Sequence, residues 1–132
     1  MITRIVNKYG AEGQKEKYLN SLSSNQVGSF CLSEAESGSD AFALKTTAKP
    51  LNSKEEEFLL NGTKMWISNA KEAGIFLVFA NVKPELGYKG ITCFIFDKNE
   101  TEGIKIGKKE QKVHTKHLVC CDQSFFYLHS WD

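Results

Sequence analysis

From residue 27 onward the chain consists of short apolar runs that are rich in β-branched and aromatic residues. Gly, Asn, Asp, Pro and Ser separate these runs, which is typical of strands joined by turns. The runs cover residues 28–32, 42–48, 57–64, 75–82, 91–97 and 104–108. We expect residues 50–57 and 83–90 to be hairpin connections, and Asn61-Gly62 to be a turn dipeptide. The pattern therefore predicts a mainly β, mostly antiparallel domain.

The amino-terminal residues follow a different period. Apolar side chains recur at helical spacing in two stretches, which Gly10 separates. The two stripes contain Ile2, Ile5, Val6, Tyr9, Tyr18, Leu19 and Leu22. Two short amphipathic helices cannot bury their apolar faces against each other alone. We therefore expect residues 1–24 to be the end of a helical domain that precedes the β domain.

Length and charge limit the classes of function. The 132 residues make roughly one domain. A formal net charge of +1 gives no overall field that would attract nucleic acid or an anionic membrane. No apolar run reaches the ~18 to 20 residues that span a bilayer. The amino terminus lacks the apolar core of a secretory signal, and we expect any import signal to be missing from this chain.

The cysteines give no sign of a metal site or a disulfide framework. They lie at Cys31, Cys93, Cys120 and Cys121, without a metal-ligand spacing. This usage favours a reducing compartment.

Small hydroxyl and glycine residues crowd the stretch "CLSEAESGSD", residues 31–40. One interpretation is a loop whose amides and hydroxyls hold a phosphate-bearing ligand, because such groups are short, fixed donors. The other is a polar surface turn. Glu34 and Glu36 could be an acid-base pair, but neighbours of this kind are usually solvated, and we do not expect either to be catalytic.

A second stretch, "NGTKMWISNA", covers residues 61–70. Taken alone, Trp66 fits a core or rim aromatic better than a cofactor platform. The two stretches together resemble the middle domain of the acyl-CoA dehydrogenase family, which carries segments similar to "FCLSEAESGSD" and, about 30 residues later, "LNGTKMWISNA". The resemblance runs from the first helix through Lys112 and is strongest to the short/branched-chain members. It implies that residues 25–112 form an incomplete antiparallel β-barrel.

The resemblance also implies a flavin site. Phe30, Leu32 and Ser33 would lie at the edge of the FAD isoalloxazine ring. Trp66 would cover one ring face, and Ser68 would hydrogen-bond near the hydride-accepting nitrogen. The residues expected to bind FAD are Phe30, Leu32, Ser33, Gly38, Ser39, Trp66, Ile67 and Ser68.

Two residues are expected near the acyl-CoA substrate by the same resemblance. Ser39 would lie between the cofactor and the acyl-CoA. Tyr88 matches a family position near the bound acyl-CoA, although its side chain fits a hairpin equally well.

The family reaction removes two hydrogens across the α and β carbons of an acyl thioester. A glutamate takes the α proton, FAD accepts the β hydride, and the electrons pass to an electron-transfer flavoprotein. The resemblance further implies a homotetramer in the mitochondrial matrix. The glutamate lies in a carboxy-terminal helical domain without a counterpart here, so we expect the isolated chain to be inactive. A flavin-dependent acyl-CoA oxidase relative and a non-catalytic fragment are the alternatives.

Residues 113–132 depart from the family pattern. All three histidines and two of the four cysteines lie in this segment, but none of the ten glycines does. His114 and His117 would suggest a metal pair only with further ligands nearby, and we expect no metal site. We expect this divergent tail not to complete the barrel, which would leave an unpaired sheet edge.

Overall fold

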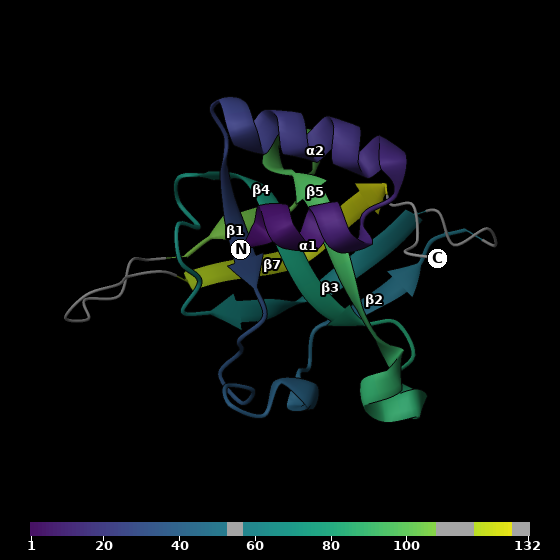
Figure 1. The fold of residues 1–132 in the computed structure, drawn as a ribbon. Helices are drawn as coiled ribbons and strands as arrows, with labels where there is room; N and C mark the ends of the chain where they lie inside the picture. The colour runs from purple at the N-terminus through teal and green to yellow at the C-terminus, as the bar shows by residue number, and fades with distance from the viewer. Residues whose placement is uncertain (53–56, 108–117, 128–132) are drawn as a thin grey trace.

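The computed structural model describes residues 1–52 and 57–107 in full, and residues 118–127 as a backbone strand (Figure 1). The strands are β1 (Val27–Cys31), β2 (Thr47–Pro50), β3 (Glu57–Met65), β4 (Ala73–Asn81), β5 (Ile91–Asp97), β6 (Ile104–Ile106) and β7 (Leu118–Tyr127). The expected runs are therefore confirmed as strands, with one exception near residue 42.

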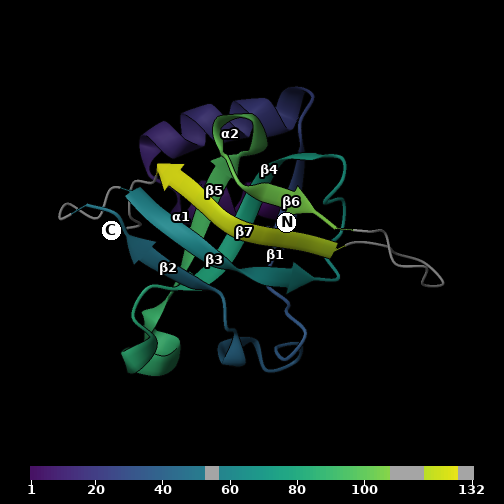
Figure 2. The ribbon, with the colours of Figure 1, turned by 180° about the vertical axis from the view of Figure 1, so that it is seen from behind.

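These strands form one sheet in the order β1-β4-β2-β3-β7-β6, and β5 also pairs with β4. The β2–β3 and β4–β5 pairs are antiparallel, as predicted, and the β3–β7 and β6–β7 pairs are antiparallel too. The β1–β4 pair is parallel. Among the described strands β6 pairs with β7 alone and β1 with β4 alone, so the sheet does not close into a complete barrel (Figure 2).

The expected strand at 42–48 is wrong over most of its length. A short 3-10 helix, η1 (Ala41–Ala43), replaces its first part, and the Asp40 side chain accepts a hydrogen bond from the Phe42 amide. The amides of Lys45 and Thr46 donate to the Glu34 carboxylate. Since these amides are bonded to a side chain, regular strand pairing begins only at Thr47.

We expected the divergent tail not to complete the barrel; its residues 118–127 nevertheless join the sheet as β7, and the sheet still does not close. This strand pairs with β3 from Glu57↔Tyr127 to Met65↔Leu118, and with β6 around Ile104↔Cys121 (Figure 2). The free edge of β3 offers unpaired N–H and C=O groups, and any extended segment can satisfy them. His114, His117 and the lysines at 108, 109 and 112 lie outside the described residues.

Asn61-Gly62 is not a turn but lies inside β3. The register against β7 shifts between Leu60 and Gly62. A Cβ atom at Gly62 would lie 2.3 Å from Thr46 Oγ1. This close approach of two backbone segments explains the glycine.

The predicted hairpin connections are confirmed. Residues between β2 and β3 join an antiparallel pair, although 53–56 lie outside the described residues. Between β4 and β5 the chain forms 3-10 turns, η2 (Pro84–Gly90), with Gly87 at φ 59°.

Both faces of β4 are buried, and they belong to different cores. Phe76, Val78 and Ala80 pack with Phe58 and Phe94 on one face. Ile75 and Leu77 face the other way. This alternation with period two explains why the β4 segment is almost continuously apolar.

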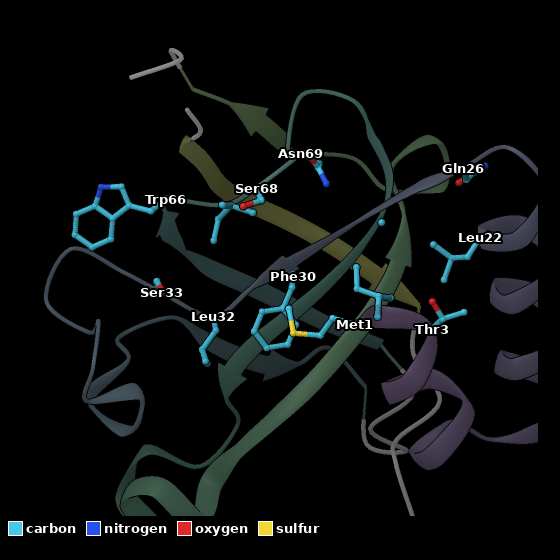
Figure 3. A pocket seen from close by; sticks show the side chains of 13 residues that line it. Met1, Thr3, Leu22, Gln26, Phe30, Leu32, Ser33, Trp66, Ser68 and Asn69 are labelled. Carbon is cyan, nitrogen blue, oxygen red and sulfur yellow. The ribbon is translucent and has the colours of Figure 1, made fainter. Parts of the chain in front are cut away.

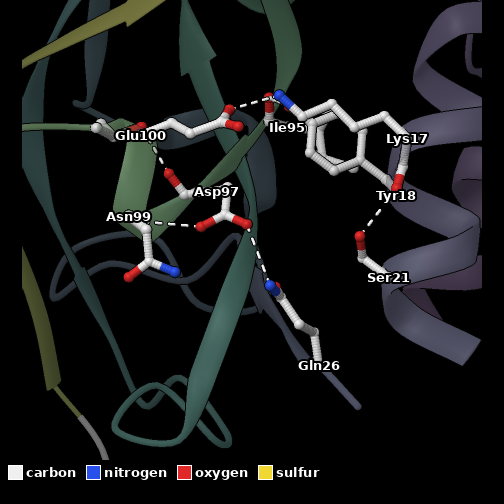
Figure 4. Close-up of polar contacts among 9 residues, drawn as sticks. Lys17, Tyr18, Ser21, Gln26, Ile95, Asp97, Asn99 and Glu100 are labelled. Atoms are coloured by element: carbon white, nitrogen blue, oxygen red, sulfur yellow. Dashed lines mark hydrogen bonds and ion pairs between the residues drawn. The ribbon is translucent and has the colours of Figure 1, made fainter. Parts of the chain in front are cut away.

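The second core is covered by two helices, α1 (Ile2–Tyr9) and α2 (Glu12–Ser24), as predicted (Figure 1). Ile2, Val6 and Tyr18 are buried against β4 and β5. Midway along α2, Lys17 forms an ion pair with Glu100, and the Tyr18 hydroxyl lies 3.5 Å from the Ile95 carbonyl oxygen (Figure 4). Among the described residues no helix is long and apolar enough to cross a membrane.

Candidate functional site

A pocket of about 490 Å³ opens between the start of α1, the end of β1 and the loop that follows β3 (Figure 3). Its lining combines apolar and aromatic side chains with hydroxyl and amide groups. The lining residues are Met1, Ile2, Thr3, Leu22, Gln26, Gly28, Phe30, Leu32, Ser33, Trp66, Ile67, Ser68 and Asn69.

The two stretches that carry the family resemblance meet in this pocket; we call residues 30–40 the first motif and residues 60–70 the second motif. Phe30, Leu32 and Ser33 come from the first motif, and Trp66, Ile67 and Ser68 from the second. Two hydrogen bonds join the segments: the Met65 amide donates to the Ser33 carbonyl oxygen at 2.8 Å, and the buried Ser29 hydroxyl donates to the Ser68 carbonyl oxygen at 2.7 Å. The fold therefore places in one wall residues that are more than 30 positions apart.

Trp66 occupies an unusual backbone conformation. Its φ is 57°, in the left-handed region, and Asn69 in the same loop has φ 61°. A residue other than glycine in this region costs of order 1 to 3 kcal/mol, and such strain concentrates at functional sites. The indole is 45% exposed and lies at one end of the pocket (Figure 3). A large aromatic ring is thus held partly in solvent where it can cover a planar ligand.

Among the other lining side chains, one aromatic ring is held by packing and two hydroxyls have no hydrogen-bond partner in the described part of the chain. The Phe30 ring packs edge-on against Phe79, with 5.3 Å between the ring centroids. Within the part of the chain that the structure describes, the Ser33 and Ser68 hydroxyls make no hydrogen bond. They are short donors that a ligand in the pocket can use.

Three of the predicted site residues do not line the pocket. Gly38 and Ser39 lie exposed in the turn after Glu34. Tyr88 is 59% exposed in η2, where its ring lies 5.3 Å from the Phe42 ring. The predicted roles of Gly38, Ser39 and Tyr88 in binding cofactor or substrate stay predictions.

The expectation that Glu34 is solvated is wrong, whereas Glu36 is exposed. Glu34 is 4% exposed and its carboxylate forms an ion pair with Lys64, at 2.6 Å. Burial raises the pKa of the Glu34 carboxyl, but hydrogen bonds from Lys64, Thr46 and Lys45 outweigh burial and hold the pKa below its ordinary value. Because neither Glu34 nor Glu36 lines the pocket, neither is placed to act as its acid or base.

Several lining residues were not predicted from the sequence. Met1, Ile2, Thr3 and Leu22 reach the pocket because the helices pack across β4 and β5. Gln26 also lines it: its amide nitrogen donates to Asp97 at 3.3 Å, while its buried oxygen has no partner within the described chain (Figure 4). No short-range pattern marks these positions, because their contacts depend on the tertiary fold.

No group of three or more His, Cys, Asp or Glu side chains in residues 1–52 and 57–107 could hold a metal ion.

Residues 29–126 match the family model "Acyl-CoA dehydrogenase, middle domain". The chain is 53% identical over 122 residues to a probable short/branched chain specific acyl-CoA dehydrogenase of Dictyostelium discoideum, covering 92% of this chain and 29% of the relative. It is 49% identical over 125 residues to the mitochondrial short/branched chain specific acyl-CoA dehydrogenase of Rattus norvegicus, covering 95% and 28%. The chain thus spans less than a third of the length of these relatives.

The fold is also similar to a crystal structure of an acyl-CoA dehydrogenase from Bacillus anthracis complexed with FAD. The TM-score is 0.77 and the sequence identity is 31%, over 90% of this chain and 20% of that one.

Proposed function

We propose that this chain, which belongs to the acyl-CoA dehydrogenase family and carries its middle domain, binds the isoalloxazine ring of FAD in the pocket between α1 and the β3–β4 loop. The observation that carries the proposal is the meeting of both motifs in one pocket. The FAD in the Bacillus anthracis structure supports the choice of cofactor.

The residues present fit such a group. A volume of about 490 Å³ falls within the range of small-molecule and cofactor sites, ~300 to 1,000 Å³. Trp66 and Phe30 supply aromatic surface for a planar ring, and the Ser33 and Ser68 hydroxyls supply donors for its polar edge. FAD would supply the hydride-accepting chemistry when bound.

The chain's own residues have separate tasks in this proposal. Trp66 excludes water from one ring face, and Ser68 donates a hydrogen bond to the ring. Leu32 and Ile67 add apolar surface beside these donors. Ser39 and Gly38 serve the pyrophosphate or the acyl-CoA, and Tyr88 the acyl-CoA, at the exposed side of the domain.

For the whole protein we propose α,β-dehydrogenation of a short or branched acyl-CoA, with electrons passing to an electron-transfer flavoprotein. The names of the relatives from Dictyostelium and rat support the substrate class, and the rat name supports a mitochondrial location. A homotetramer, and the division into residues 1–24, 25–112 and 113–132, belong to the same proposal.

We further propose that the chain is inactive alone. None of the described pocket-lining residues is an aspartate, glutamate or histidine. The pocket by itself therefore offers no side-chain base for the α proton.

Purification followed by FAD titration tests the proposal. Bound flavin should change its visible absorption and quench its fluorescence, and addition of a short branched acyl-CoA should leave it oxidised. If flavin spectra never change at saturating protein, the chain is a non-catalytic fragment without a flavin site. If acyl-CoA reduces the bound flavin, the proposed inactivity is wrong.

A further inference from the structure

A buried ion pair lies directly behind the pocket wall. Lys64 is 1% exposed and Glu34 4% exposed, whereas the other ion pairs of the described residues lie at the surface. Neither side chain lines the pocket. A buried pair often adds little net stability compared with apolar residues of similar size, because both charges lose their water. We therefore ask which main-chain positions the Glu34–Lys64 pair holds in place.

Lys64 reaches the pocket wall through the main chain. Its ammonium lies 3.0 Å from the Leu32 carbonyl oxygen and donates to it, as well as to Glu34. The next residue, Met65, donates its amide to the Ser33 carbonyl oxygen at 2.8 Å. Two consecutive residues of β3, Lys64 and Met65, thus donate hydrogen bonds to the carbonyl oxygens of two consecutive residues of the first motif.

Glu34 joins the same wall to two further segments. One carboxylate oxygen accepts from the Thr46 amide at 3.1 Å and its hydroxyl at 2.5 Å, and the other from the Lys45 amide at 2.5 Å. The Glu34 main chain pairs with Ser37 in an isolated bridge. The carboxylate therefore ties Glu34 to the segment before β2, and the Glu34 main chain closes the turn that leads to Gly38 and Ser39.

We propose that the Glu34–Lys64 pair is a positioning device: it sets the main chain of Leu32 and Ser33 so that the flavin ring edge meets fixed donors. This inference rests on the proposed flavin function. The pair acts through the wall and does not touch the ring, so both are positioning residues.

The test separates an effect on the position of the pocket wall, measured as FAD affinity, from an effect on the free energy of unfolding. Lys64→Met should weaken FAD binding at least about tenfold, since Leu32 loses its donor and Glu34 stays buried without its partner. The double variant Glu34→Gln with Lys64→Met removes the charge imbalance and should regain much of the unfolding free energy. It should still bind FAD weakly, because Leu32 again lacks its donor.

Thr46→Val is the milder variant, and it removes one hydroxyl contact to Glu34. It should weaken FAD binding by roughly two- to fivefold. Phe94→Leu is the matched control, because Phe94 is buried in the core and does not line the pocket. It should lower stability and leave the dissociation constant of the folded fraction within about twofold.

Hydrogen exchange without FAD gives an independent readout. In each ion-pair variant the Glu34 and Met65 amides should exchange faster, while Leu77 in β4 stays protected. If binding follows stability through all variants, or if the Glu34 and Met65 amides keep wild-type exchange, the positioning role is refuted. If the wild type itself binds no FAD, the proposed function fails, and the exchange data still decide whether the pair holds this wall.

Discussion

The Ser29 hydroxyl donates a hydrogen bond to the Ser68 carbonyl oxygen at 2.7 Å and so joins β1 to the loop that carries Trp66. Ser29 is almost fully buried. The bond ties the middle of β1 to this loop, and Ser68 at its other end lines the pocket.

Removing this bond should loosen the loop. Ser29→Ala is expected to cost about 0.5 to 1.5 kcal/mol of unfolding free energy and to weaken FAD binding by several-fold. Denaturant unfolding and FAD titration measure the two effects. Ser23→Ala is the control, because that hydroxyl bonds within α2 at the surface. Unchanged FAD affinity in Ser29→Ala would show that the loop position does not depend on this bond.

The left-handed conformation of Trp66 predicts an unusual order of stability. Both Trp66→Ala and Trp66→Gly should lose about 1 to 3 kcal/mol of flavin binding, since each removes the ring. Trp66→Gly should nevertheless be the more stable protein by about 1 kcal/mol, because glycine adopts φ near 57° without strain. Thermal unfolding of the two variants makes the comparison. The reverse order would mean that residue 66 does not hold this conformation.

Glu34 predicts a dependence of stability on pH. Hydrogen bonds from Lys64, Thr46 and Lys45 hold the pKa of the Glu34 carboxyl in the folded chain below its ordinary value of about 4.5. At a pH between the folded-state and unfolded-state pKa of Glu34, the unfolded chain binds a proton that the folded chain does not. The stabilisation by Glu34 is therefore complete above about pH 4.5 and is lost as the pH falls towards the folded-state pKa. Unfolding free energies from pH 7 to 3 should fall more steeply for the wild type than for Glu34→Gln. Parallel curves would exclude this contribution.

Substitution by alanine should change the unfolding free energy in opposite directions at Gly62 and at Gly13. Gly62→Ala places a methyl group against Thr46 and should cost about 1 to 3 kcal/mol. Gly13→Ala in α2 meets no atom within 4 Å and should be neutral or stabilising by up to about 1 kcal/mol. Denaturant midpoints compare them. Equal effects would contradict the close contact between Gly62 and Thr46.

Local patterns predicted most of the strands and both helices. The apolar segment that became β4 was recognisable because its side chains alternate between two cores. The segment from Phe42 to Thr46 was not, because its amides bond to the distant Glu34 carboxylate. The sequence likewise did not predict the parallel pairing of β1 with β4 or the pairing of β7 with β3, because both depend on which strand edges lie side by side in the folded chain.

For the pocket, the family resemblance named six residues that line it, and their role in binding FAD stays a prediction: Phe30, Leu32, Ser33, Trp66, Ile67 and Ser68. It gave no indication of Met1, Thr3 or Gln26, which arrive through the packing of α1 and α2. Glu34 was misjudged for a related reason. A carboxylate next to Ser and Gly looks like part of a solvated turn, and only the three-dimensional structure brings Lys64 to it.

The central claim is that FAD binds in the pocket that joins the two motifs, and an amide-resolved titration tests it most directly. FAD is added to the isotopically labelled chain while backbone amide and indole N–H resonances are followed, with AMP as the control for binding through adenine alone. The claim predicts saturable shifts at Ser33, Trp66 and Ser68 with FAD and none there with AMP. Saturable shifts confined to η2 or the outer face of α2, or identical shifts with AMP, would contradict it.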